Sequence, residues 1–197
     1  ITNFTNRYGR FAISILLLIG LYRIADIVMG VIANVFYLEK GFNINEIATY
    51  SKFFGVFATI FGGFLGGIFA LKFGTMRALF LGALIAAASN LLFAWLAVAP
   101  ISIKFLITVI TADNISSGFA GAAFVVYLSG LTSVKFTATQ YALFSSIMLF
   151  LPKLIAGYSG SWVDIMGYAN FFTLTAILGI PVLLMIIWIA KVAPIKN

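Results

Sequence analysis

The sequence predicts an all-α integral membrane protein with six transmembrane helices, arranged as two inverted three-helix repeats. Of its 197 residues, 63% are hydrophobic and 9% are charged, whereas soluble domains carry roughly 25% charged residues. The mean hydropathy is +1.14. The apolar residues fall into long runs, and each run approaches or exceeds the roughly 20 residues that a helix needs to cross a bilayer.

Polar residues and turn signals divide the chain into six expected helices. They cover residues 11–38, 47–71, 77–99, 101–134, 139–158 and 169–190. The connections are the segments 39–46, 72–76, 135–138 and 159–168 and a turn at Pro100. Pro152 should kink the fifth helix, because proline removes a backbone hydrogen bond. The six-helix domain thus covers residues 11–190, between a cytoplasmic linker at 1–10 and a cytoplasmic tail at 191–197.

Lysine and arginine are concentrated on one side of the predicted bundle. This side carries Arg7, Arg10, Lys72, Arg77, Lys135, Lys191 and Lys196. The other side carries Lys40 and Lys104. Because loops rich in lysine and arginine stay in the cytoplasm, we expect both termini of this segment to be cytoplasmic.

Charged residues inside the apolar runs occupy matching helices of the two predicted triplets. Arg23 and Asp26 lie in the first helix and Asp113 in the fourth, each near the middle. Lys52 and Lys153 lie in the second and fifth helices, nearer the outer side. A charge at the bilayer centre costs on the order of 2.5–3.5 kcal/mol. We therefore interpret the deep charges as functional residues that line a cavity between two inverted repeats.

Polar and small residues repeat at helical spacing on three helices. The first helix carries Arg23, Asp26, Gly30, Asn34 and Tyr37. The fourth carries Asp113, Ser116, Ala120 and Tyr127, beside Asn114, Ser117, Gly118 and Gly121. The second carries Lys52, Gly55, Thr59, Gly62 and Gly66. From these faces we predict a substrate-binding set of Arg23, Asn34, Lys52, Asn114, Ser117 and Tyr127.

The second helix contains two overlapping Gly-x-x-x-Gly pairs. These are formed by Gly62 with Gly66 and by Gly63 with Gly67. Small residues at this spacing let helix backbones approach closely in membranes. We predict that the four glycines serve helix packing and not ligand binding.

Each polar feature also has a structural interpretation. The less favoured interpretation of Arg23 and Asp26 is a purely structural ion pair, and that of Asp113 is hydrogen bonding to neighbouring helices. Lys52 and Lys153 are long enough to reach the outer interface. A six-helix subunit that transports nothing, or a half-transporter that forms a homodimer, also remains compatible with the sequence.

Composition argues against several other classes of protein. The chain has no cysteine and no histidine, so it lacks thiol nucleophiles, imidazole bases and the usual zinc ligands. Without clustered carboxylates either, we expect no enzyme activity, no metal site and no cofactor. The net charge of +7 comes from basic residues scattered singly, which argues against a nucleic-acid interface.

Four segments resemble the muropeptide permease (AmpG-type) family of the major facilitator superfamily. Leu21-Tyr-Arg-Ile-Ala-Asp26 is similar to the family's Leu-Tyr-Lys-x-Gly-Asp, and the segment 52–63 to its second helix. The segment 113–124 is similar to its Glu-Asn-x-x-x-Gly-x-Gly-x-x-Ala-Phe. Thr137-Ala-Thr-Gln-Tyr-Ala-Leu-Phe-Ser145 matches its Ser-Ala-Thr-Gln-Phe-Ala-Leu-x-Ser. Arg replaces the family's Lys at position 23, and Asp replaces its Glu at 113.

This resemblance implies the C-terminal half of a twelve-helix transporter, with an N-terminal six-helix half of the same protein and the lipid bilayer as partners. The implied activity is proton-coupled import of muropeptides, which are N-acetylglucosamine–anhydro-N-acetylmuramic acid and its peptide-linked forms, in peptidoglycan recycling. The related acetyl-CoA transporters share part of the pattern, so another bulky anionic solute is the alternative cargo. The proton gradient would drive either transport.

Asp113 and Asp26 are the candidate proton carriers. Burial near the midplane disfavours the charged form of both carboxyl groups, while the neighbouring Arg23 favours the charged form of Asp26. We therefore expect Asp113 to carry the proton and Asp26 to hold Arg23. Arg23 would then bind a substrate carboxylate.

Overall fold

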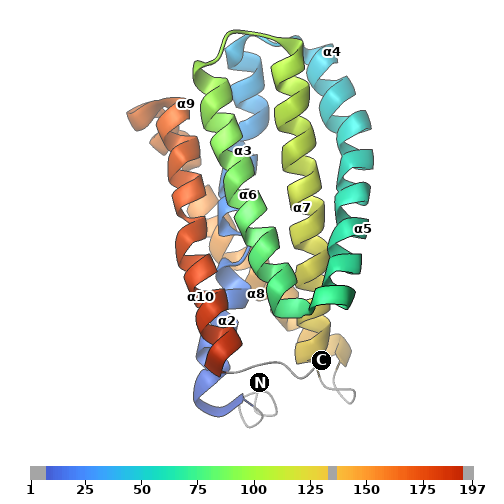
Figure 1. The fold of residues 1–197 in the computed structure, drawn as a ribbon. Helices are drawn as coiled ribbons and strands as arrows, with labels where there is room; N and C mark the ends of the chain where they lie inside the picture. The colour runs from blue at the N-terminus through green and yellow to red at the C-terminus, as the bar shows by residue number, and fades with distance from the viewer. Residues whose placement is uncertain (1–7, 133–136, 193–197) are drawn as a thin grey trace.

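The computed structural model describes residues 8–132 and 137–192. Within them, six helical segments are long and apolar enough to cross a membrane, and no strand occurs. The spans are Gly9–Lys40, Ile44–Phe73, Thr75–Val98, Ile103–Leu131, Ala138–Ala156 and Ser159–Val192. The prediction of an all-helical protein with six spans is confirmed. The first span begins and the last span ends at the same end of the bundle (Figure 1), which we call the terminal end.

The spans are assembled from shorter elements. These are η1 (Gly9–Phe11), α2 (Ala12–Leu21), α3 (Ile24–Lys40), α4 (Ile44–Ile47), the π-helix η2 (Ala48–Phe54), α5 (Gly55–Phe73), α6 (Thr75–Val98), α7 (Ile103–Leu131), α8 (Thr137–Ala156), α9 (Ser159–Ile177) and α10 (Gly179–Val192). Pro152 lies inside α8. The last part of the predicted fourth helix, residues 133–134, lies outside the described residues.

Three spans that the sequence predicted as continuous helices are interrupted. The first breaks between α2 and α3, and the second passes from α4 through a π-helical segment into α5. The sixth, predicted over 169–190, is interrupted between α9 and α10. Before it, in the predicted connection, the chain turns at Gly167, whose φ of 75° is a conformation that glycine adopts without steric cost. The loop predicted at 159–168 is wrong, because the chain is helical from Ser159 up to this turn.

Local sequence determines the turn between the first two spans. Gly41 ends α3 with a φ of 102°, and its N–H donates to the Leu38 carbonyl. Asn43 then begins α4 by accepting from the Asn45 N–H at 2.8 Å, while Glu46 accepts from the Asn43 N–H at 3.0 Å. This reciprocal capping box satisfies backbone donors that a helix start leaves free.

The two triplets of helices are interlocked. The fourth span, α7, packs against α5 and α6 of the first triplet. In the same way α2 and α3 of the first span pack against α8, and α3 also packs against α9, in the second triplet. The third and sixth spans meet through α6, α9 and α10. This exchange is what two inverted three-helix repeats produce.

Glycine contacts bring α5 and α7 together. A Cβ atom at Gly62 would lie 2.1 Å from the Ile115 carbonyl oxygen, and one at Gly66 would lie 2.5 Å from that of Phe119. Gly118 faces α5 in the same way, with the Thr59 carbonyl oxygen 2.1 Å from its Cβ position. Gly63 makes an ordinary contact of 3.7 Å, and Gly67 has no atom within 4 Å. Gly67 therefore takes no part in this packing.

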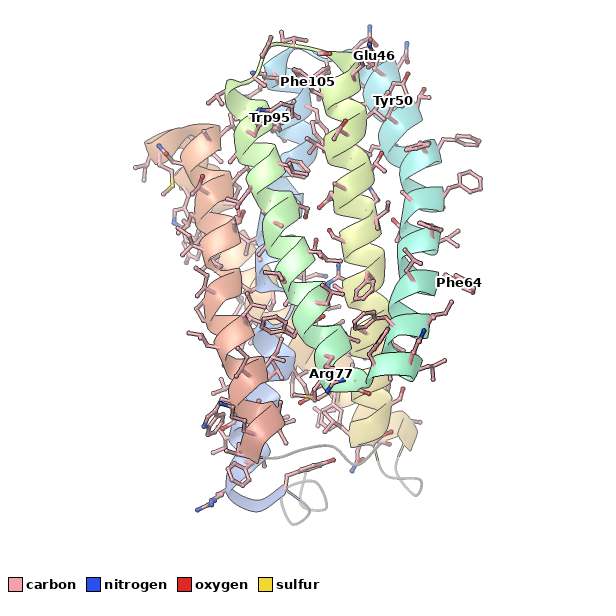
Figure 2. All side chains as sticks on the ribbon, viewed as in Figure 1. Glu46, Tyr50, Phe64, Arg77, Trp95 and Phe105 are labelled. Atoms are coloured by element: carbon pink, nitrogen blue, oxygen red, sulfur yellow. The ribbon has the colours of Figure 1, made fainter. Side chains whose placement is uncertain are left out.

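Aromatic side chains lie where a bilayer would surround the bundle. Phe64 projects outward from α5, whereas Trp95 and Phe105 lie at the end opposite the termini (Figure 2). The rings of Trp95 and Phe105 are 4.7 Å apart between centroids. Trp188 is half-exposed near the terminal end. Trp and Tyr are enriched at the two membrane–water interfaces, so this distribution fits a membrane-spanning orientation.

The glycine geometry predicts unequal effects of two neighbouring substitutions. Gly62→Ala should lower the free energy of unfolding by about 1–3 kcal/mol, because its methyl group would overlap backbone atoms of α7. Gly67→Ala, the matched control, should leave stability unchanged. Thermal unfolding of both variants in detergent checks this, and equal midpoints would contradict the packing described.

Candidate functional site

A break in the first span forms the centre of the candidate site. Arg23 occupies the junction with φ −100° and ψ 15°, directly before the first residue of α3. Tyr22 anchors the junction, because its ring stacks on Phe124 at 4.6 Å and its hydroxyl donates to the Leu79 carbonyl at 3.2 Å. Gly82 on α6 leaves room for that hydroxyl, since a Cβ there would lie 2.7 Å from it.

Arg23 forms an ion pair with Asp26, and both contact Ser117 on α7. Arg23 Nη2 donates to Ser117 Oγ at 2.8 Å, and Ser117 Oγ donates to Asp26 Oδ2 at 3.4 Å. The side chains of Arg23 and Asp26 are 25% and 15% exposed. Asp26 also lies in the first turn of α3, where the helix dipole favours negative charge. Arg23, Ser117 and the N-terminus of α3 therefore all lie close to the Asp26 carboxyl group.

Asp113 lies one helical turn before Ser117 on α7 and has a different environment. Its Oδ1 atom is buried without a hydrogen-bond partner in the described part of the chain. The Nε atom of Arg23 is buried and unpartnered as well. An unsatisfied buried polar group costs on the order of 1–3 kcal/mol. Asp113 thus has a buried carboxyl oxygen without a hydrogen-bond partner, whereas Asp26 has an oxygen bound by both Arg23 and Ser117.

The structure brings together only part of the predicted polar faces. Gly30 and Asn34 are exposed on α3, but Tyr37 is buried. Ser116 is buried on α7. Tyr127 is fully buried and lies about 15 Å along α7 from Ser117, at a helical rise of about 1.5 Å per residue. Tyr127 therefore does not contact the Arg23–Asp26 pair, because this end of the predicted polar face of α7 lies in the core.

Asn114 is engaged in helix packing. Its Oδ1 accepts from Thr59 Oγ1 at 2.9 Å, and its Nδ2 donates to the Ile110 carbonyl at 2.8 Å. A Cβ at Gly55 would lie 3.1 Å from this amide. Asn114 therefore links α7 to α5 and lies away from the Arg23–Asp26 pair.

Asn34 and Lys52 lie together in a separate pocket. This cavity of about 300 Å³ is lined by Asn34, Leu38, Ile44, Ile47, Ala48, Ser51 and Lys52. It is formed by α3, α4 and η2, nearer the end opposite the termini. Lys52 is exposed and lies within the π-helical segment. Such segments occur frequently at functional sites.

Sequence reasoning missed the polar contacts made by the third span. Ser89 accepts from Ser116 at 3.1 Å, and Asn90 donates to the Ala25 carbonyl at 3.2 Å. The adjacent Ser89 and Asn90 are the signal that could have indicated this, because they interrupt an otherwise apolar run. Neither residue is charged, so the charge pattern that singled out the first and fourth helices did not single out the third.

The ion pair predicts non-additive effects on stability. Asp26→Asn should lower the free energy of unfolding by about 2–3 kcal/mol, less than for a fully buried pair, because it leaves Arg23 without a counter-ion. Arg23→Gln/Asp26→Asn should recover most of this loss. Denaturant unfolding in mixed micelles measures both, with exposed Asp164 changed to Asn as the control. A double variant no more stable than Asp26→Asn alone would show that the pair is not coupled.

Comparisons with known proteins agree with this architecture. No family model matches the chain. It is 35% identical over 181 residues to "Putative transporter AmpG 4" of Rickettsia felis. These residues cover 92% of this chain and 44% of that protein. It is 36% identical over 177 residues to "Putative transporter AmpG 1" of Rickettsia bellii, covering 90% of this chain and 43% of that protein.

The chain thus spans less than half the length of the curated relatives it matches. The aligned part includes nearly the whole six-helix bundle, so the similarity is not confined to one motif. The chain is therefore a multi-pass membrane protein similar to proteins named "Putative transporter AmpG", and its six-helix architecture is consistent with one half of a major facilitator superfamily transporter.

Proposed function

We propose that the chain is the C-terminal half of a proton-coupled permease that imports muropeptides across the bacterial inner membrane for peptidoglycan recycling. The observation that carries this proposal is the partly exposed Arg23–Asp26 pair, held by Ser117 at a helix break near Asp113, whose buried Oδ1 has no hydrogen-bond partner among the described residues. Intramembrane charges of this kind mark substrate and proton pathways. The names of the relatives support a transporter rather than an enzyme.

Arg23 is the proposed binding group for a carboxylate of the cargo. Its guanidinium has five donors, and an incoming carboxylate can compete with Asp26 for two of them in a bidentate arrangement. The 25% exposure of its side chain gives access from the polar side of α3. Ser117 would keep the guanidinium oriented while the partner changes.

Asn34 and Lys52 are the proposed groups that the cargo meets first. The pocket they line lies toward the end that the distribution of lysine and arginine assigns to the periplasm. Lys52 supplies a positive charge that raises the local concentration of an anionic solute. Asn114 and Tyr127 have packing roles in this proposal, because neither side chain lies at the Arg23–Asp26 pair.

Asp113 is the proposed proton carrier. When its carboxyl group ionises, a buried oxygen without a donor must hold negative charge, which is costly away from water. Asp26 has Arg23, Ser117 and a helix N-terminus to hold its charge. Asp113 lies one turn of α7 from Ser117, which contacts Arg23, so proton uptake at Asp113 and cargo binding at Arg23 are close enough to influence each other.

Removal of the proposed proton carrier should uncouple transport. In the full-length protein, Asp113→Asn should abolish uptake driven by a proton gradient and keep exchange of labelled muropeptide across the membrane. Asp26→Asn should impair both, and Asp164→Asn should impair neither. Proteoliposome uptake measures these rates. Normal proton-driven uptake by Asp113→Asn would exclude Asp113 as the carrier.

The outer pocket predicts a change in apparent affinity. Lys52→Gln should raise the KM for an anionic cargo about 5- to 10-fold with little change in kcat, since one favourable charge contact of roughly 1 kcal/mol is lost. Lys104→Gln removes an equally exposed charge from the same end and serves as the control. An unchanged KM for Lys52→Gln would remove this pocket from the transport route.

A further inference from the structure

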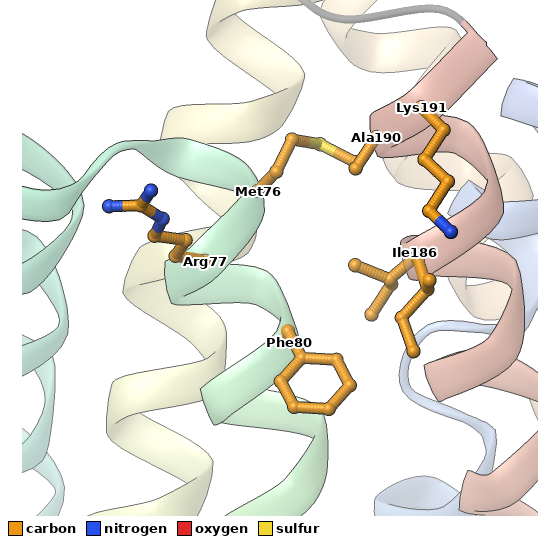
Figure 3. Close-up of a pocket in the computed structure, with 7 residues that line it drawn as sticks. Met76, Arg77, Phe80, Ile186, Ala190 and Lys191 are labelled. Atoms are coloured by element: carbon orange, nitrogen blue, oxygen red, sulfur yellow. The ribbon is translucent and has the colours of Figure 1, made fainter.

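A second pocket opens at the terminal end between the third and sixth spans. It has a volume of about 310 Å³ and is lined by Met76, Arg77, Phe80, Ile186, Ile187, Ala190 and Lys191. Figure 3 shows Phe80 and Ile186 facing this space from α6 and α10, while Met76 reaches across toward Ala190. Arg77 and Lys191 border the pocket from α6 and α10, and the Arg77 guanidinium extends away from α10. The interior is therefore apolar and the rim is cationic.

The cations at this rim have no acidic partner among the residues that the structure describes. All five acidic residues of the sequence lie within the spans or at the other end: Asp26, Glu39, Glu46, Asp113 and Asp164. Figure 2 shows Glu46 and Arg77 at opposite ends of the bundle. Arg77 and Lys191 make no hydrogen bond or ion pair among the described residues. The rim consequently presents uncompensated positive charge.

The surroundings of the pocket are suited to lipid. The sides of α6 and α10 away from the core expose Leu84, Leu91, Ile180, Leu184, Ile187 and Trp188. Trp188 adjoins the pocket residue Ile187 and contacts Phe11 at 6.2 Å between ring centroids. A half-exposed Trp near a span end is typical of the level of the lipid headgroups. The pocket thus extends from headgroup level into the hydrocarbon region.

We infer that this pocket binds an acidic glycerophospholipid, with its phosphate at Arg77 and Lys191 and part of one acyl chain against Phe80 and Ile186. Basic pockets between spanning helices bind acidic headgroups in other membrane proteins. The apolar interior selects an amphiphile over a free phosphate ion. Arg77 points away from α10 in Figure 3, and rotation of its flexible side chain brings it to the phosphate. The bound lipid would hold α6 and α10 together at this end.

Native mass spectrometry of the full-length protein tests this inference with phosphatidylglycerol and phosphatidylcholine of identical acyl chains. The unmodified protein should retain phosphatidylglycerol in preference to phosphatidylcholine. Arg77→Gln/Lys191→Gln should lower this retention at least 10-fold, because each basic residue near a membrane contributes roughly 5-fold in affinity. Ala190→Phe, which fills the pocket and keeps its charges, should lower it similarly. Inorganic phosphate should not displace the lipid.

The matched control removes two charges from the same end. Arg10 and Lys72 lie against the rings of Phe11 and Phe73, outside the pocket. Arg10→Gln/Lys72→Gln should therefore retain phosphatidylglycerol within 2-fold of the unmodified protein. If this control lost as much phosphatidylglycerol as Arg77→Gln/Lys191→Gln, the binding would reflect the total positive charge of this end and not a defined site. Equal retention of both lipids by the unmodified protein would also overturn the inference.

Crosslinking of the unmodified protein avoids any dependence on variant folding. A phosphatidylglycerol with a photoreactive group in one acyl chain should attach within residues 76–80 and 186–191. Attachment only elsewhere, or coverage of these residues by another part of the protein, would refute lipid occupancy. Neither readout requires transport, so this inference can fail while the proposed function stands.

Discussion

The hydrocarbon core of a bilayer offers no hydrogen-bond partners, so polar groups within it must be satisfied by the protein. The contact of Arg23 with Asp26 and Ser117 meets this constraint and connects the first span to the fourth. The first span is broken at the same residue, Arg23, directly before α3. The small residue at Gly82 and the stacked ring of Tyr22 then serve to hold that break in place.

Two kinds of helix contact divide the bundle. The fourth span is joined to the second by close approach of backbones at Gly62, Gly66 and Gly118, which leaves no room for rearrangement. Its link to the first span runs instead through polar side chains of Arg23, Asp26 and Ser117. Side-chain contacts can exchange partners without moving a backbone, whereas glycine-packed helices move as one body. A change of partner at Arg23 is therefore the step that could shift one triplet relative to the other.

Composition and apolar runs were sufficient to predict the six spans, because a bilayer imposes length and hydropathy on every helix that crosses it. The deep positions of Arg23, Asp26 and Ser117 were also predictable. Helical spacing and the free-energy cost of a charge in the bilayer centre point to the same helix faces. The break at Arg23, the π-helix at Lys52 and the inward rotation of Tyr127 were not. They depend on which neighbour each residue meets, such as Phe124 for Tyr22 or Thr59 for Asn114, and a single sequence does not contain those pairings.

Separate roles for the two carboxyl groups follow from their hydrogen-bond partners. Infrared difference spectroscopy of the full-length protein, recorded as the pH is lowered, reports the C=O band of a newly protonated carboxyl group. If Asp113 carries the proton, this band is lost in Asp113→Asn and persists in Asp26→Asn. A band that persists in Asp113→Asn and disappears in Asp26→Asn would contradict the assignment, and would make the Arg23–Asp26 pair the proton site.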